Sequence, residues 1–191
     1  MRWQQLFADL AAQFAHAEAA EELAESASRA RSELGAVTLV DRLGGSVGSP
    51  LRVRCRGAGQ VAGVLADLGP GWLLLVDERG AECLVAAGAV TSVTGLGRRT
   101  SADVEEDGRP RVRFDLRLLL RAMARDRSAV SVMTDDGVVL TGTVDRVGAD
   151  FVELAEHPMG EPRRASAVRA VHAIALDAVA LVARTAEAAS G

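Results

Sequence analysis

From residue 51 onward, apolar and polar residues alternate, and this alternation predicts β-structure. Leu51, Val53 and Cys55 are each followed by an arginine. Because successive side chains of a strand point to opposite faces, one face is expected to be buried and the other exposed. Short apolar runs between glycine- and aspartate-rich turns continue the pattern. They predict strands at 51–56, 60–68, 72–77, 82–86 and 90–96, and again at 129–134, 138–147, 151–156, 163–166 and 171–176.

The two sets of strands arise from an internal duplication. The pattern that begins at Ser49 recurs 79 residues later at Ser128, and Trp72-Leu-Leu-Leu75 recurs as Phe151-Val-Glu-Leu154. Gly63 and Gly142 lie at matching places inside a predicted strand. A glycine inside a strand is typical of a bend or bulge that lets a sheet curl. The sequence therefore predicts two similar small β-modules, each made of five strands.

Residues 2–34 predict one long amphipathic helix, because large apolar side chains recur there at three- and four-residue spacing. A helix of about 33 residues would be about 50 Å long, which exceeds the width of a small module. We therefore expect its apolar stripe to pair with a helix of a second copy or of another protein; the alternative is a lid over one of the modules. The stripe consists of Trp3, Leu6, Phe7, Leu10 and Phe14.

Two shorter helices are predicted, one before each set of strands, at 37–47 and 116–125. The chain then divides into five regions, and the last of them is expected to be helical from Asp177, a residue type suited to an N-cap. These regions are an N-terminal helix (1–35), a first helix-plus-barrel module (37–97), a polar linker (98–114), a second helix-plus-barrel module (115–176) and an alanine-rich tail (177–191).

A known fold family shares this order of elements. A helix followed by the pattern Val-x-Val, two spaced glycines and Asp-Phe-Val-x-Leu resembles the Sm-like fold over Leu116–Leu176, and more loosely over Thr38–Leu96. Small SH3-like barrels in ribosome-maturation factors and biotin-ligase repressors are similar, the latter especially to Gly69–Leu75. The resemblance implies a mainly β protein with two tandem five-stranded small barrels, each preceded by a short helix, behind a long N-terminal helix. Sm-like proteins commonly bind single-stranded RNA as rings, so RNA is one expected partner.

Arginines form the candidate RNA-binding surface. Arg52, Arg54 and Arg56 share the outward parity of one strand and could neutralise phosphates, which would make binding strongly salt-dependent. The other interpretation is a solvated strand face paired with acidic residues such as Glu82. The full candidate set is Arg52, Arg54, Arg56, Arg98, Arg99, Arg163 and Arg164.

Other chemistry has little support in the residues. Cys55 and Cys83 are too few for a disulfide framework, and buried reduced thiols fit a cytoplasmic protein. The three histidines show no metal-ligand spacing, and no local motif indicates a catalytic set or a cofactor site. Asp9 interrupts the N-terminal apolar stretch, so neither a signal peptide nor a membrane span is predicted.

Two functions remain as hypotheses. The first is a non-enzymatic cytoplasmic adaptor that binds a protein partner or itself through the N-terminal helix and the barrels. The alternative is an RNA-binding regulatory protein, with DNA the less favoured nucleic acid. A net charge of −4 favours the first, because nucleic-acid binders usually carry a basic face. The loops that carry stacking residues in Sm-like proteins hold no aromatic residue here, which also favours the first.

Overall fold

The computed structural model describes residues 35–101, 114–158, 164 and 166–184, and these residues are mainly β. Two α-helices and a short 3-10 helix accompany ten strands. The helices are α2 (Leu39–Gly44), η1 (Ala87–Ala89) and α4 (Leu116–Asp126). The strands are β1 (Pro50–Cys55), β2 (Gly59–Gly69), β3 (Trp72–Val76), β4 (Glu82–Ala86), β5 (Val90–Thr94), β6 (Ala129–Thr134), β7 (Val139–Val147), β8 (Phe151–Glu156), β9 (Ala170–Ala175) and β10 (Val179–Arg184). The prediction of a mainly β chain with helices is confirmed.

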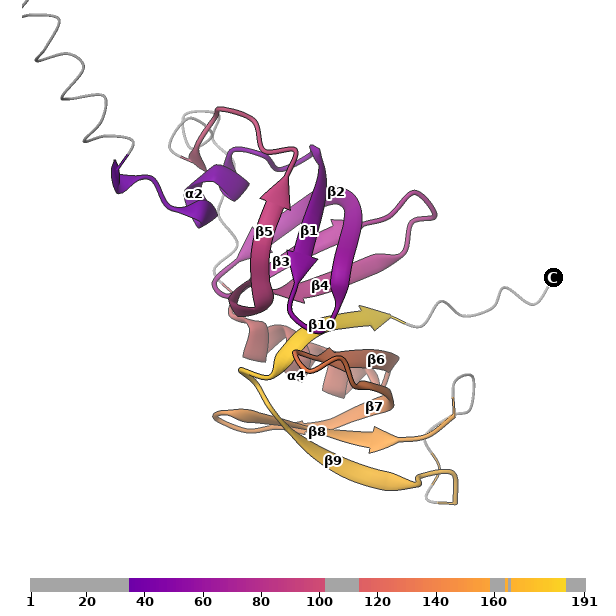
Figure 1. Cartoon of the computed structure of the whole chain (residues 1–191). Helices are drawn as coiled ribbons and strands as arrows, with labels where there is room; N and C mark the ends of the chain where they lie inside the picture. Colours follow the sequence, from indigo (N-terminus) through magenta and orange to yellow (C-terminus); the bar gives the residue numbers. More distant parts are fainter. Residues whose placement is uncertain (1–34, 102–113, 159–163, 165, 185–191) are drawn as a thin grey trace, which may run out of the picture. The chain divides into compact units, whose positions relative to one another are not determined.

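All ten strands belong to one antiparallel sheet. Its order is β5-β1-β2-β3-β4-β10-β6-β7-β8-β9 (Figure 1). The first half of the molecule, residues 35–101, contributes five neighbouring strands, and the second half, residues 114–184, contributes the other five. In each half the last strand of the chain lies beside the first, so the two blocks have the same internal order.

The sheet corrects the expectation of two separate closed barrels. Strand β10 is hydrogen-bonded to β6 of its own half and to β4 of the first half. This second pairing joins the halves, and β5 and β9 are left at the two ends of a sheet that does not close. The physical reason is that β10 offers a hydrogen-bonding edge on each side and finds a partner for both.

The duplication is visible in the irregularities of the ladder. The pairing of β2 with β3 shifts register between Leu65 and Asp67, and the pairing of β7 with β8 shifts at the matching place, between Val144 and Arg146. The pairing of β1 with β5 and that of β6 with β10 also shift at matching places. Such bulges bend a strand and increase its twist. The two halves therefore bend at the same points of the repeated sequence.

The predicted alternation on β1 is confirmed. Leu51, Val53 and Cys55 are buried, whereas the three arginines between and after them are exposed. The three buried residues join a core in the first half that includes Leu43 of α2. A second core lies beneath α4, whose Leu120 is fully buried, and it takes in Trp72 of β3. Apolar residues of the first half thus contribute to the core of the second.

Two expectations for the second half are wrong. Residues 163–166 were expected to form the fourth strand, but the fourth strand is β9; Arg164 lies outside any helix or strand, and 163 and 165 lie outside the described residues. The tail from Asp177 was expected to be helical, but β10 occupies Val179–Arg184. The alanines favour a helix, but β10 lies between β4 and β6 in the sheet. Val179–Val182 are all buried there, so tertiary contacts override the local propensity.

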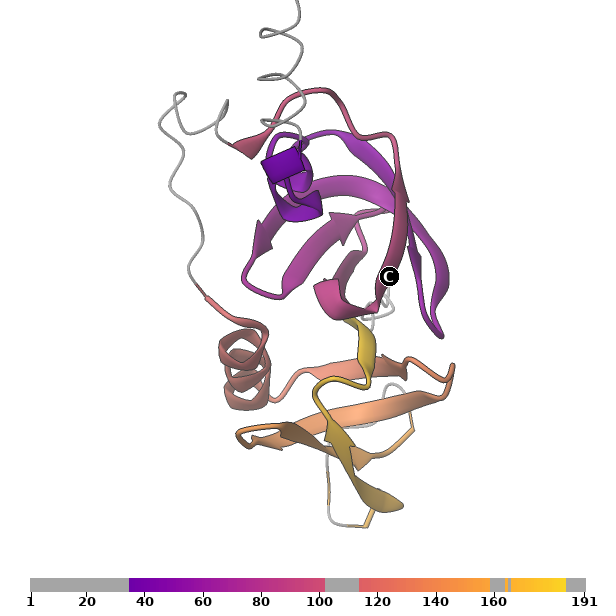
Figure 2. The same cartoon turned by 60° about the vertical axis from the view of Figure 1, so that its left-hand side comes forward.

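The predicted short helices are both present. Helix α4 packs against β7 (Figure 2), and the Asp115 side chain caps it by accepting a hydrogen bond from the Leu118 backbone N–H at 2.8 Å. Helix α2 is shorter than the predicted 37–47. The predicted N-terminal helix, residues 102–113 of the predicted linker and residues 185–191 lie outside the described part of the chain.

Candidate binding surfaces

Arg52 and Arg54 form an exposed basic face on β1. Their partners across the ladder are Ala62 and Gln60 on β2, and Thr94 and Ser92 on β5. No carboxylate lies directly opposite either arginine. Glu82, the example of an acidic partner in the other interpretation, lies 3.9 Å from a guanidinium nitrogen of Arg184. Within the described residues, Arg52 and Arg54 are thus two cations on one face of the sheet with no ion pair.

Arg56 differs from its two neighbours on the strand. Its Nη2 donates to the Gly88 carbonyl at 2.6 Å, and its Nε lies 3.9 Å from a carboxylate oxygen of Asp135 in the second half. The guanidinium is therefore held by the turn before β5 and by the opposite half. Its structural contacts separate it from the basic face formed by Arg52 and Arg54.

The remaining candidates do not join this face through any described contact. Arg98, Arg99 and Arg164 are exposed, and the backbone of Arg99 lies against Gly45 after the end of α2. Arg163 lies outside the described residues, as do all five members of the N-terminal apolar stripe, Trp3, Leu6, Phe7, Leu10 and Phe14. Of the seven predicted arginines, Arg52 and Arg54 are the two that the ladder of the described strands places on one face, and the seven-residue surface stays a prediction.

The joint between the halves is a strand pair that the sequence did not predict. Leu181, Val182 and Ala183 of β10 lie opposite Val85, Leu84 and Cys83 of β4. Leu84, Val85, Leu181 and Val182 are all buried. The run Val179-Ala-Leu-Val182 is the signal that could have found it, because four consecutive apolar residues are typical of a strand covered on both faces.

The ends of the sheet are two strand edges. Among the strands that the structure describes, β5 is hydrogen-bonded to β1 alone, and β9 to β8 alone. Thr91, Ser92 and Thr94 are exposed on β5; on β9 Val171 is 55% exposed, and Ala173 is also exposed. An edge strand presents a row of N–H and C=O groups that can pair with another chain. Both ends of the sheet can therefore accept a further strand.

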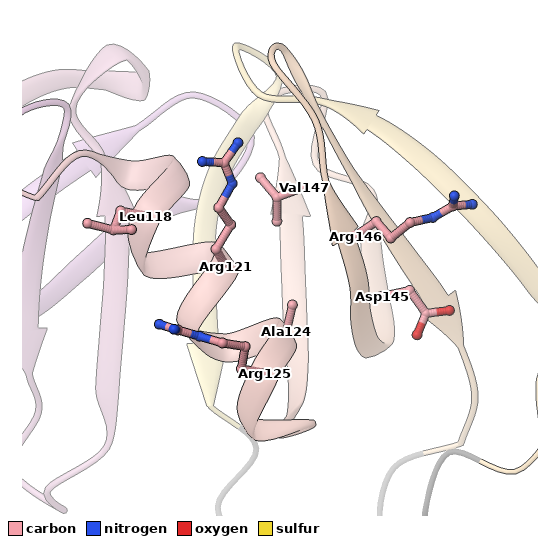
Figure 3. A pocket seen from close by; sticks show the side chains of 7 residues that line it. All are labelled: Leu118, Arg121, Ala124, Arg125, Asp145, Arg146 and Val147. Carbon is pink, nitrogen blue, oxygen red and sulfur yellow. The ribbon is translucent and has the colours of Figure 1, made fainter.

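A groove runs between α4 and β7. It has a volume of about 480 Å³. Arg121 and Arg125 project from successive turns of α4, whereas Arg146 of β7 points away from the helix (Figure 3). The groove is lined by Leu118, Arg121, Ala124, Arg125, Asp145, Arg146 and Val147.

The polar and thiol groups in and around the core have structural surroundings: His157 is hydrogen-bonded, and both cysteines are at least partly buried. Both ring nitrogens of His157 have partners: Nδ1 donates to the Pro158 carbonyl at 3.0 Å, and Nε2 accepts from the Thr143 hydroxyl at 2.8 Å. Burial raises the pKa of the Cys55 thiol, and burial together with the Asp77 charge raises that of Cys83. Both shifts favour the neutral thiol over the nucleophilic thiolate.

The described residues carry neither a metal-ligand cluster nor a membrane-spanning helix, and the chain matches no protein-family model. No cluster of three or more metal-ligating side chains occurs among the described residues. None of the helices in the described ranges combines the length and hydropathy needed to cross a membrane. Comparison with protein-family models gave no match, and neither did comparison with curated protein sequences.

Proposed function

We propose that this chain is a non-enzymatic binding protein that assembles with a second copy of itself through the edges of its sheet. The observation that carries the proposal is the joint between β4 and β10. Because the halves are duplicates, β9 corresponds to β4 and β5 corresponds to β10. The two edges that pair inside the chain are thus present again, unpaired, at the two ends of its sheet.

The internal joint defines the register of the proposed contact. Val90 pairs with Cys55 as Val179 pairs with Thr134, so Ser92 and Val93 correspond to Leu181 and Val182. By the same matching, Ala173 and Ile174 correspond to Leu84 and Val85. We expect Val93 of one copy to lie opposite Ala173 of the next. Such a head-to-tail contact produces a ring if its rotation closes, or a filament if it does not.

The proposed contact is weaker than the joint inside the chain. Where β10 places Ala180 and Leu181, β5 places Thr91 and Ser92, so less apolar surface is removed from water. Main-chain hydrogen bonds then supply most of the affinity. This favours reversible assembly, which suits an adaptor. Each half repeats the same unit of one helix and five neighbouring strands, so the same strand edges recur at both ends of the sheet.

A single substitution tests the assembly contact. Ala173→Glu places a charge on the exposed face of β9 and should leave one copy folded, while it buries an unpaired carboxylate in the proposed contact. We expect sedimentation equilibrium to show a mass that rises with concentration for the native chain and stays at one copy for Ala173→Glu. Ala66→Glu, exposed on the central strand β2, is the matched control and should assemble normally. A monomeric native chain, or unchanged assembly of Ala173→Glu, would contradict the proposal.

The N-terminal segment is a second contributor in this proposal. Its apolar stripe is expected to pair with that of another copy or of a protein partner. Deleting residues 1–34 from the Ala173→Glu variant and from the native chain separates the two contacts. If the segment contributes, the shortened native chain should assemble only at higher concentration than the full native chain; the same concentration dependence for both would exclude that contribution.

RNA binding is the second candidate, and the exposed pair Arg52 and Arg54 favours it. Residues two apart on a strand lie about 7 Å from each other, so both can contact one extended phosphate backbone. Replacing both with Ser should weaken binding of a single-stranded oligonucleotide and reduce its salt dependence by about one ion for each lost contact. Arg146→Ser, which removes an exposed arginine paired with Glu153, is the control. Equal affinity of the double variant and the control would exclude this face.

A further inference from the structure

The face of α2 is covered by a later segment of its own chain. Arg42 donates from Nη2 to the Gly97 carbonyl at 2.5 Å, and Ser101 donates from its hydroxyl to Asp41 at 2.9 Å. The backbone approaches so closely that a Cβ on Gly45 would overlap the Arg99 carbonyl. The segment Gly97–Ser101 therefore packs against α2 and the turn that follows it.

The corresponding face of α4 is open among the described residues. Arg121 takes the place of Arg42 in the duplication, and Arg125 the place of Ser46. Leu118 is 40% exposed, much like its counterpart Leu39 at 46%, and a groove of about 480 Å³ lies beside α4. This volume is within the range of sites that bind small ligands. The groove thus lies beside Arg121 and Ala124, the counterparts of Arg42 and Gly45, whereas Leu120, the counterpart of Asp41, is buried in the core.

The charged side chains that line the groove determine which charge a ligand must carry. Asp145 lies 3.4 Å from Arg127, and Arg146 lies 2.7 Å from Glu153, so these groups are paired. Arg121 and Arg125 are exposed and have no hydrogen bond or ion pair with any described residue. Being four residues apart, they start from the same side of the helix, and their side chains extend in different directions (Figure 3).

We propose that the groove between α4 and β7 binds an extended acidic peptide segment of a partner protein. Two carboxylates at positions i and i+2 of an extended chain are about 7 Å apart, close to the separation of side chains one helical turn apart. They pair with Arg121 and Arg125, and apolar atoms of the peptide contact Leu118 and Val147. A peptide fits better than a nucleic acid because the lining includes apolar side chains, and because Arg42, the counterpart of Arg121, donates to a peptide carbonyl. This site is separate from the sheet edges and goes beyond the assembly proposed above.

The test uses the full chain and a defined probe, the blocked peptide Gly-Asp-Leu-Asp-Gly. Amide chemical shifts of 118–125 and 145–147 should move on titration, and the Asn-Leu-Asn peptide should not move them. We expect Arg121→Ala and Arg125→Ala each to weaken binding roughly two- to fivefold, as for an ion pair near a protein surface. Arg169→Ala, which removes an exposed arginine elsewhere in the second half, should leave the affinity unchanged.

A charge reversal distinguishes recognition from a structural effect. The double variant Arg121→Glu, Arg125→Glu should lose the acidic peptide and gain a Gly-Lys-Leu-Lys-Gly peptide at the same amides. Equal binding of the Asp and Asn peptides, or no shift at the groove, would overturn the proposal. Preferential binding of inorganic phosphate or of a single-stranded oligonucleotide at these residues would overturn it in favour of a polyanion site. None of these outcomes depends on the oligomeric state.

Discussion

The two halves of the molecule share one strand order but differ in the strand that ends each of them. Strand β10 lies inside the sheet and buries Val179–Val182, whereas β5 lies at an end of the sheet and exposes Thr91, Ser92 and Thr94. The same position in the duplicated unit is apolar where a strand has neighbours on both sides and polar where one side is free. The difference shows that the polarity of a strand's residues depends on whether other strands flank it, even where the fold of the repeated unit is the same.

The leading helices differ in a related way. Gly44 and Gly45 at the end of α2 leave room for a segment of chain to lie on the helix. Their counterparts on α4 are Met123 and Ala124, and the helix continues to Asp126. One helix is thus shortened and covered, while the other is longer and leaves its charged face open.

The largest expected effect on stability comes from placing a charge in β10, compared with the same charge in β5. Leu181→Asp buries an unpaired carboxylate between β4 and β6 and should cost more than about 3 kcal/mol of the free energy of unfolding. Ser92→Asp, at the matching position of β5, should change it by less than about 0.5 kcal/mol. Chemical denaturation at a concentration where the chain is monomeric measures both. If Leu181→Asp does not fold, Leu181→Ala should still cost about 2–5 kcal/mol.

A comparable loss for the two aspartates would contradict this comparison. It would mean that β5 is as fully enclosed as β10. The same pair of variants therefore also tests whether β5 is a free edge in solution.

A smaller effect is expected from the buried pair of Thr143 and His157. Thr143→Val keeps the shape of the side chain but leaves the His157 Nε2 without its donor, and should cost about 1–3 kcal/mol. Its counterpart in the first half is Val64, which is 42% exposed, so Val64→Thr should be nearly neutral. Thermal unfolding of the two variants measures the contrast; equal melting temperatures would show that the hydrogen bond contributes nothing.

The smallest effect concerns the N-cap of α4 and depends on pH. The hydrogen bond from the Leu118 N–H, and then the Arg117 side chain, lower the pKa of Asp115. Because the folded-state pKa is below the unfolded one, the cap stabilises the protein above the unfolded pKa and loses this effect as pH falls through the folded pKa. Asp115→Ala should therefore lower the melting temperature slightly at neutral pH and leave it unchanged in acid. A loss of the same size at both pH values would exclude the charge as its cause.

Much of the local structure could be predicted from residue patterns. The alternation around Val53 and the turn at Gly69-Pro-Gly71 placed β1, β2 and β3 to within a residue or two. The internal duplication correctly predicted helix α4 and strands β6 to β8. These features depend on contacts within a hairpin or a helix, which the local sequence encodes.

The later strands of the second half could not be placed in the same way. The longer connection between β8 and β9 shifts the duplication, so the local pattern around 163–166 was misleading. The alanines of the tail favour a helix in isolation, and β10 forms because β4 and β6 hydrogen-bond to it. The candidate arginines also depend on tertiary structure. Among the described residues, Arg52 and Arg54 are the two that the pairing of β1 with its neighbours places on one face.

The sequence by itself determined a duplicated, mainly β chain, with an inward apolar face and an outward arginine face on its first strand. The tertiary structure alone decided that the halves join through β4 and β10, that β5 and β9 end the sheet, and that α4 stands beside an open groove. Periodicity reports which side of an element is buried. It does not report which distant strand supplies the backbone hydrogen bonds, because N–H and C=O groups are the same in every residue but proline.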